Sequence, residues 1–213
     1  MLLTDPDFGK LFVCPCRGGS TLGRLQELSG LHEQERKLRL ADIEVKGRPG
    51  TRRMVKACRL FLEEPVGSLT IHGSPGNGKT MAAQAVVNEL NALGIRAEYV
   101  TAHDLLGYVK EGFEGRASTR TSSSAERLQR YIDLPVLVLD DFDKVHLTEW
   151  AGNTLTALMQ GRGRREEQGR SGTLIVMNSA PASLLQSIAS RLCDGRNRIV
   201  HNQDADIRPA LKR

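Results

Sequence analysis

The chain has 213 residues, of which 39% are hydrophobic and 26% charged, and this suits one globular α/β domain with a short appendage. No apolar run reaches the roughly 18 residues of a membrane span, and the acidic N-terminus MLLTDPDFGK is unlike a signal peptide, so we expect a cytoplasmic protein without a membrane partner. The net charge of +5 favours a polyanionic partner, and nucleic acid is the first candidate.

Residues 1–50 are predicted to form a mostly polar N-terminal appendage, and residues 51–213 the main domain. Cys14 and Cys16 form a CPC motif whose thiolates can supply half of a tetrahedral zinc site. Two free or partly buried thiols are the alternative, because His32 is the only histidine nearby. Leucines interleaved with charged residues predict a solvated helix over residues 21–40, and the run KGRPGTRR then predicts a linker.

Helix-prone and β-prone segments alternate from residue 51 onward. Helices are expected over residues 51–64, over the MAAQAVVNEL run up to a cap at Gly94, and over 104–113, 124–131, 149–162 and 183–192. Strands are expected at residues 69–71, 96–100, the VLVLDD run, 173–177 and 198–201. This alternation predicts a three-layer α/β/α fold with its site at the carboxyl edge of a parallel sheet.

The stretch GSPGNGKT fits the phosphate-binding pattern GxxxxGK[ST] between a predicted strand and a predicted helix. Glycines let the backbone approach a phosphate closely, the lysine supplies charge for the β- and γ-phosphates, and the threonine hydroxyl can bind Mg²⁺. An ordinary turn is the alternative, but the flanking strand and helix argue against it. The candidate nucleotide-binding residues are Gly73, Ser74, Pro75, Gly76, Asn77, Gly78, Lys79 and Thr80.

Polar residues also follow two later strands. Asp140 ends the VLVL run, where its carboxylate can reach the Mg²⁺ bound by Thr80, and Asp141 can polarise an attacking water. Asn178 follows the TLIVM strand and can orient the same water. Arg191 and Arg208 are candidates for neutralising charge in the transition state, although either alone can be a solvated surface arginine.

The motifs GSPGNGKT, VLVLDDFDK, TLIVMNSAP, SRL and DIR, in this order, resemble those of the DnaC/IstB-like AAA+ ATPases over residues 50–210. The resemblance implies Walker A at Lys79 and Thr80, Walker B at Asp140 and Asp141, and sensor 1 at Asn178. It also implies an arginine finger at Arg191 and a sensor 2 arginine at Arg208. The segment around Cys14 and Cys16 looks like half of the zinc module found in some relatives, where an upstream CxxC completes the ligands.

The resemblance implies a DNA-stimulated ATPase, most similar to helicase loaders that form ATP-dependent homo-oligomers on single-stranded DNA and deliver a replicative helicase. An IstB-like transposition helper, which binds duplex DNA and recruits a transposase, is the close alternative. A P-loop metabolite kinase and a nucleotide-gated scaffold with negligible hydrolysis also stay open. The arginines expected to contact DNA are Arg116, Arg120, Arg162, Arg164 and Arg165.

Overall fold

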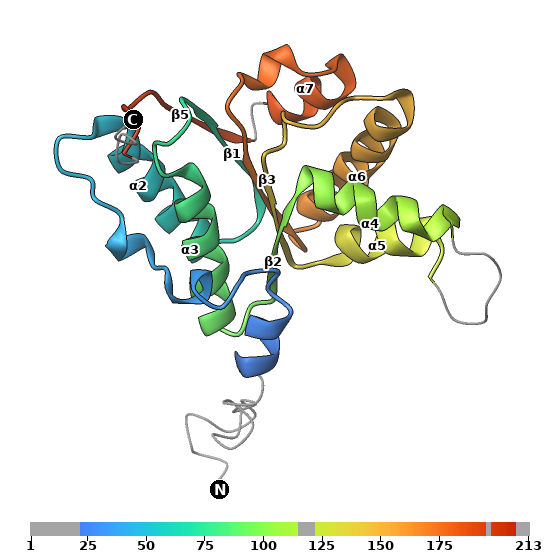
Figure 1. Ribbon diagram of the computed structural model, residues 1–213, viewed down its shortest axis with the longest axis horizontal. Coiled ribbons are helices and arrows are strands. Elements are labelled where there is room, and N and C mark those ends of the chain that lie inside the picture. The colour runs from blue at the N-terminus through green and yellow to red at the C-terminus, as the bar shows by residue number, and fades with distance from the viewer. Residues whose placement is uncertain (1–21, 115–121, 195–196, 208–213) are drawn as a thin grey trace, which may run out of the picture.

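The computed structural model describes residues 22–114, 122–194 and 197–207. Within these residues five parallel strands form one sheet in the order β2-β3-β4-β1-β5 (Figure 1). Because every pair is parallel, the carboxyl ends of all five strands meet at one edge of the sheet. The strands are β1 (Gly67–Gly73), β2 (Ala97–Thr101), β3 (Val136–Asp140), β4 (Gly172–Val176) and β5 (Arg198–Asn202).

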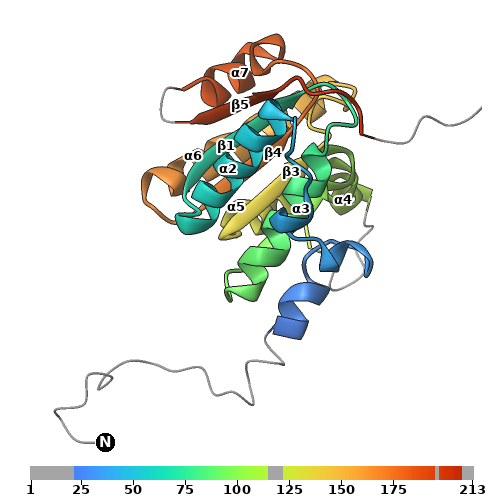
Figure 2. The same ribbon diagram turned by 90° about the vertical axis from the view of Figure 1, so that its left-hand side faces the viewer.

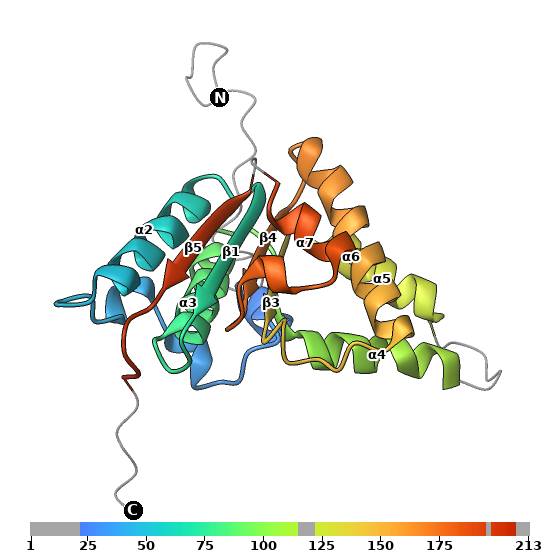
Figure 3. The same cartoon turned by 90° about the horizontal axis from the view of Figure 1, so that it is seen from above.

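Helices cover both faces of this sheet, as Figures 1 and 3 show. One face packs against α2 (Pro49–Glu63) and α3 (Lys79–Ala92), which lie in front of the strands in Figure 2. The other face packs against α4 (Ala102–Glu114), α5 (Ser124–Asp133), α6 (Glu149–Glu167) and α7 (Gln186–Leu192). The arrangement confirms the predicted three-layer α/β/α fold.

The strands supply each face with alternate side chains, as the two-residue period of a strand requires. In β3, Val136 and Val138 belong to the core under α2 and α3, whereas Leu137 and Leu139 belong to the core under α4 to α7. All four are buried. The sheet is therefore covered on both faces, which explains why its central strands read as continuous apolar runs.

The predicted helix over residues 21–40 is wrong, because it ends early. The chain is helical only over residues 22–27 of this segment, and two short 3₁₀ helices follow, η1 (Glu35–Lys37) and η2 (Leu40–Asp42). Gly30 turns the chain with a φ of +74°, and a Cβ there would lie 2.1 Å from the carbonyl oxygen of Tyr99. A positive φ does not occur inside a right-handed helix, so the helix ends before Gly30.

The segment after this turn packs on α3. Leu31, Leu40 and Ile43 are buried in the same apolar cluster as α2 and α3. The Glu89 carboxylate of α3 accepts a hydrogen bond from the Leu40 amide at 2.7 Å. Asn88 donates to the carbonyl of Glu35 at 2.7 Å. The described part of the first 50 residues thus shares a core with the sheet, while the domain division at residue 50 stays a prediction.

Several element boundaries differ slightly from the predicted ones. The last predicted helix, 183–192, divides into the 3₁₀ helix η3 (Pro181–Ser183) and α7. Gly94 follows α3 with a φ of +79°, as its predicted role in ending this helix requires. No helix of the described residues has both the length and the apolar character needed to cross a bilayer.

Arg162 was expected to contact DNA, and the structure contradicts this. Its side chain is completely buried between α6, α5 and the start of β4. Its guanidinium donates to the carbonyls of Tyr131 at 2.8 Å and Leu134 at 3.0 Å, and to the hydroxyl of Thr173 at 2.8 Å. Burial lowers the pKa of Arg162 to about 10. The arginine is a structural brace.

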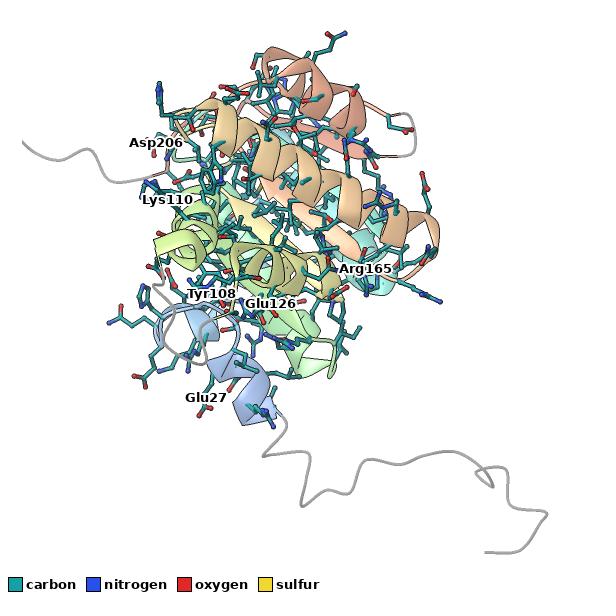
Figure 4. All side chains as sticks on the ribbon, turned by 90° about the vertical axis from the view of Figure 1, so that its right-hand side faces the viewer. Glu27, Tyr108, Lys110, Glu126, Arg165 and Asp206 are labelled. Atoms are coloured by element: carbon teal, nitrogen blue, oxygen red, sulfur yellow. The ribbon has the colours of Figure 1, made fainter. Side chains whose placement is uncertain are left out.

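The neighbouring arginines differ from Arg162. Arg165 pairs with Asp133 at 3.1 Å and lies on the side of the molecule shown in Figure 4, where Glu126 is also labelled. Arg164 is exposed. Arg116 and Arg120 lie outside the described residues. Arg164 is thus the exposed, described member of the predicted DNA-contacting set.

Replacing Arg162 with alanine is expected to lower the free energy of unfolding by about 3 kcal/mol, because several buried carbonyl groups lose their donor. Urea unfolding of the variant and the parent measures this difference. Arg164→Ala, on the exposed side of the same helix, is the matched control and should change the value by less than about 0.5 kcal/mol. Equal stabilities of the two variants would contradict the bracing role.

Candidate active site

The glycine-rich loop joins β1 to α3 and lies at the carboxyl edge of the sheet. Gly73 has a φ of +135°, and a Cβ at this position would lie 1.9 Å from the carbonyl oxygen of Asn202 on β5. Gly78, with a φ of +91°, directly precedes α3 and lets the chain turn into the helix. The amino end of α3 therefore points into the loop, where its positive dipole favours an anion.

Lys79 lies against the loop that it follows. Its ammonium donates to the carbonyls of Gly73 at 2.9 Å and Ser74 at 2.7 Å, and to the Asn77 side-chain oxygen at 3.2 Å. Burial lowers the pKa of Lys79, while the nearby carboxylate of Asp140 acts in the opposite direction. The loop thus holds a buried cation beside an acid.

The two predicted acids end β3 in different environments. Asp140 is only 2% exposed, and its carboxylate accepts hydrogen bonds from the Tyr99 hydroxyl and from the Asp141 amide, both at 2.7 Å. Asp141 has a φ of +51°, and its carboxylate pairs with Lys144 at 2.8 Å. Aspartate tolerates this left-handed backbone conformation better than most residues do. The Asp140 carboxylate therefore bonds to Tyr99 and to a backbone amide in a buried residue, whereas the Asp141 carboxylate pairs with a lysine on a side chain that is partly exposed.

One cavity of ≈ 240 Å³ brings the predicted residues of the loop and the strand ends together. Walls of this cavity include Lys79, Thr80, Asp140, Asp141 and Asn178. The exposed residue Thr80, which carries a hydroxyl, and Asp140, which carries a carboxylate, line the same cavity. Hydroxyl and carboxylate oxygens are the hard donors that Mg²⁺ prefers, so the residues present fit this ion.

Asn202 is a positioning residue that we did not predict. The carbonyl of Asn202 accepts hydrogen bonds from the Ser74 amide at 3.2 Å and from the Asn77 side chain at 2.7 Å. Beyond it, Asp204 accepts from the Gly50 and Thr51 amides at the start of α2 at 3.1 and 2.6 Å. The end of β5 therefore joins the loop to the amino end of α2.

Asp143 is a second residue that we did not predict as part of the site. Its carboxylate accepts from the amides of Asn178 at 3.1 Å and Ser179 at 2.7 Å. Although burial opposes the shift, these hydrogen bonds lower the pKa of Asp143. The acid therefore ties the loop after β3 to the end of β4. The sequence offered one indication of this role, since Asp143 follows the two predicted acids within the run DDFDK.

Other predicted site residues lie elsewhere. Arg191 is exposed on α7 and lines a separate cavity of ≈ 180 Å³ with Gly67 and Ser68, which begin β1 at the opposite edge of the sheet. Arg208 lies outside the described residues, but the amide of its neighbour Ile207 donates to the Gly76 carbonyl at 2.9 Å. Cys14 and Cys16 also lie outside the described residues, so their zinc site stays a prediction.

Comparison with known proteins finds a family and a shared fold. The model of the AAA family, "ATPase family associated with various cellular activities", matches residues 69–198. No curated protein sequence gives a match. Both the family match and the folds described next agree with the resemblance found in the sequence.

Three solved structures illustrate the shared fold. AMPPCP-bound DnaA from Aquifex aeolicus is 21% identical with a TM-score of 0.65, over 80% of this chain and 51% of that one. The DnaC helicase loader is 22% identical with a TM-score of 0.62, over 81% of this chain and 100% of that one. DnaI is 20% identical with a TM-score of 0.61, over 86% and 98%. The chain spans about half the length of the DnaA chain.

The depressed pKa of Asp143 predicts how stability depends on pH. A carboxyl whose pKa falls below its ordinary value of 3.8 on folding adds stability above that pH, and this contribution is lost as the pH falls through the folded-state pKa. Asp143→Asn should therefore reduce the melting temperature at neutral pH, and the gap to the parent should narrow as the pH falls below 3.8.

Thermal unfolding at a series of pH values measures this gap. Asp133→Asn, at an exposed acid that pairs with Arg165, is the control and should show little difference at any pH. A gap between the Asp143→Asn variant and the parent that stays constant from neutral to acidic pH would contradict the assigned role.

Proposed function

The chain belongs to the AAA family of ATPases, and from this premise we propose that it is a DnaC-like helicase loader that binds and hydrolyses ATP in DNA replication. The cavity that joins the glycine-rich loop to the ends of β3 and β4 is the observation that carries the proposal. It unites a buried lysine, an exposed hydroxyl, two carboxylates and an amide. This is the set of groups that phosphoryl transfer to water requires.

Each residue has a proposed task in hydrolysis. Lys79 leaves the carbonyls of the loop and contacts the β- and γ-phosphates, while loop amides and the end of α3 hold the remaining phosphate oxygens. Thr80 and Asp140 would hold Mg²⁺, which would neutralise charge on these oxygens. Asp141 accepts a proton from the attacking water, and Asn178 orients that water.

The positions of Asp141 and Asp143 bear on these tasks. Asp141 is 42% exposed and is held by Lys144, so its carboxylate can be released to water by movement of one exposed lysine side chain. Asp143 fixes the backbone of Asn178 relative to the acids. These hydrogen bonds thereby hold Asn178, which is proposed to orient the water, at a fixed position relative to Asp141, which is proposed to accept its proton.

Arg191 is proposed to act in a neighbouring copy of the chain. It lies at the opposite edge of the sheet from Lys79, so it cannot reach the cavity of its own subunit. An arginine that completes the site of the next subunit requires an ATP-dependent homo-oligomer. Arg208, next to the loop-bound Ile207, is proposed as the sensor 2 arginine.

Single-stranded DNA and a replicative helicase are the proposed partners. The fold is shared with a DnaC helicase loader, and with DnaA in a complex with single-stranded DNA. The net charge of +5 suits a polyanion. Arg164 on α6, with Arg116 and Arg120, is the proposed contact to DNA, and the region of Cys14 and Cys16 the proposed docking module for the helicase.

An IstB-like transposition helper, which shares the ATPase core, remains the second candidate. Co-purification of the chain with a replicative helicase of its host, and binding to single strands in preference to duplex, supports the loader. Association with a transposase and preference for duplex DNA would instead support the transposition helper and contradict the loader. A requirement for a small phosphate acceptor would instead indicate a metabolite kinase.

ATP turnover tests the site itself. Lys79→Ala should weaken ATP binding at least about 10-fold, because a hydrogen bond to a charged group contributes about 1.5–3 kcal/mol. Asp141→Asn should retain binding and lower turnover by about 10²-fold or more, since it removes the proton acceptor. Phosphate release with and without single-stranded DNA, and binding of a fluorescent ATP analogue, separate the two effects. Unchanged turnover in Asp141→Asn would contradict its role.

The proposed contact between subunits can be tested by mixing variants. Arg191→Ala should keep ATP binding but lower turnover by about 10³-fold, the usual contribution of an arginine finger. Lys79→Ala subunits, inactive themselves, should restore part of this turnover, because they supply an intact Arg191 to their neighbours. Full turnover by Arg191→Ala alone, or no recovery on mixing, would contradict the assignment.

A further inference from the structure

Both oxygens of the Asp140 carboxylate have a defined partner. One accepts the amide of Asp141 and the other accepts the hydroxyl of Tyr99, each at 2.7 Å. Asp140 as a whole is only 2% exposed. Two fixed donors determine the plane of the carboxylate and therefore the direction of its remaining lone pairs.

Tyr99 is suited to hold this carboxylate. It lies on β2, opposite Val138 of β3, and its ring packs against the core beneath α2 and α3. A phenol O–H is a hydrogen-bond donor, and that of Tyr99 donates to Asp140 at 2.7 Å. The hydrogen bond from its hydroxyl joins two residues that are 41 positions apart in the sequence.

The backbone of Tyr99 is in turn held by the N-terminal segment. The Tyr99 amide donates to the carbonyl of Ser29 at 2.8 Å, and its carbonyl lies so close to Gly30 that a Cβ there would be 2.1 Å away. Ser29 is completely buried, and its hydroxyl donates to the Gln26 carbonyl at 2.6 Å. Ser29 and Gly30 therefore contact the backbone of Tyr99 directly.

We propose that Tyr99 is a positioning residue that couples the packing of the N-terminal segment to the orientation of the Asp140 carboxylate, and thereby to the affinity of the site for Mg²⁺. The inference rests on the proposed ATP- and Mg²⁺-binding function. It adds a physical route from residues 26–30, which follow the proposed docking module in the sequence, to the metal-binding acid. A partner that pulls on residues 26–30 would weaken the hold on Mg²⁺ without touching the nucleotide.

Tyr99→Phe tests the first part of this route, because it removes only the hydroxyl. The readout is the affinity for a fluorescent, nonhydrolysable ATP analogue, titrated first without metal and then with increasing Mg²⁺. Loss of an outer partner of a metal-binding group typically costs about 10- to 100-fold in metal affinity. The Mg²⁺ midpoint should accordingly rise about 10-fold, while the metal-free affinity stays at the value of the parent.

Tyr108→Phe on α4 is the matched control, because it also removes one tyrosine hydroxyl but packs against Tyr131 on the opposite face of the sheet from Tyr99. Its Mg²⁺ midpoint should equal that of the parent. Thermal unfolding and the metal-free affinity of Tyr99→Phe report any general loss of structure, which would change both quantities together. A selective change in the Mg²⁺ midpoint identifies positioning.

Gly30→Ala tests the second part, from the N-terminal segment to Tyr99. The new Cβ must push on the Tyr99 carbonyl, so the Mg²⁺ midpoint should rise although the substitution lies outside the cavity. Gly47→Ala is its control, since Gly47 has a similar φ of +69° but a Cβ there would meet nothing within 4 Å. Gly47→Ala shares the backbone strain and should leave the midpoint unchanged.

The outcomes separate this inference from the proposed function. Lys79→Ala in the same titration should bind the analogue weakly at every Mg²⁺ concentration. If Lys79→Ala binds like the parent, the proposed nucleotide site is wrong, and the inference is wrong with it. If Lys79→Ala loses binding while Tyr99→Phe keeps the Mg²⁺ midpoint of the parent, the nucleotide site stands and the role of Tyr99 is overturned.

Discussion

Parallel pairing places the end of every strand at one edge of the sheet, and the candidate site depends on this constraint. The register aligns Ile71 with Val176 and Leu139 with Ile175, so the residues that follow β1, β3 and β4 lie side by side at this edge. Helices on both faces bury the strands and exclude water from the sheet beneath the site. The chemistry can therefore sit in short loops while the rigid sheet determines their spacing.

Two sets of hydrogen bonds hold those loops in place. On one side, the carbonyl of Asn202 fixes the loop through Ser74 and Asn77. On the other, Asp143 fixes Asn178 relative to the acids of β3. The cavity lies between these two connections, so neither wall depends on the bound ligand for its backbone position. Such preorganisation is what allows fixed dipoles to stabilise developing charge.

Local patterns were enough to predict the strands and the placement of the glycine-rich loop, the acids and Asn178 around one cavity, and the family match confirms an AAA ATPase. The features that were missed depend on partners far away in the sequence. Tyr99 and Asp143 meet their partners 41 and 35 positions away. Arg162 was expected to be a surface charge that contacts DNA. The sequence near α6 does not reveal that the carbonyls of Tyr131 and Leu134 accept hydrogen bonds from it. The helix over residues 21–40 failed because contact with β2 determines the backbone at Gly30.

The contacts of Lys79 have a consequence for selectivity among anions. Its ammonium already has three acceptors within the loop, and any ligand must compete with them. A small anion such as inorganic phosphate offers few new contacts in exchange for those it displaces. A ligand with several linked phosphate groups offers more contacts to the loop amides and to the amino end of α3. The carbonyls of Gly73 and Ser74 and the side chain of Asn77 thus compete with any bound anion for the Lys79 ammonium.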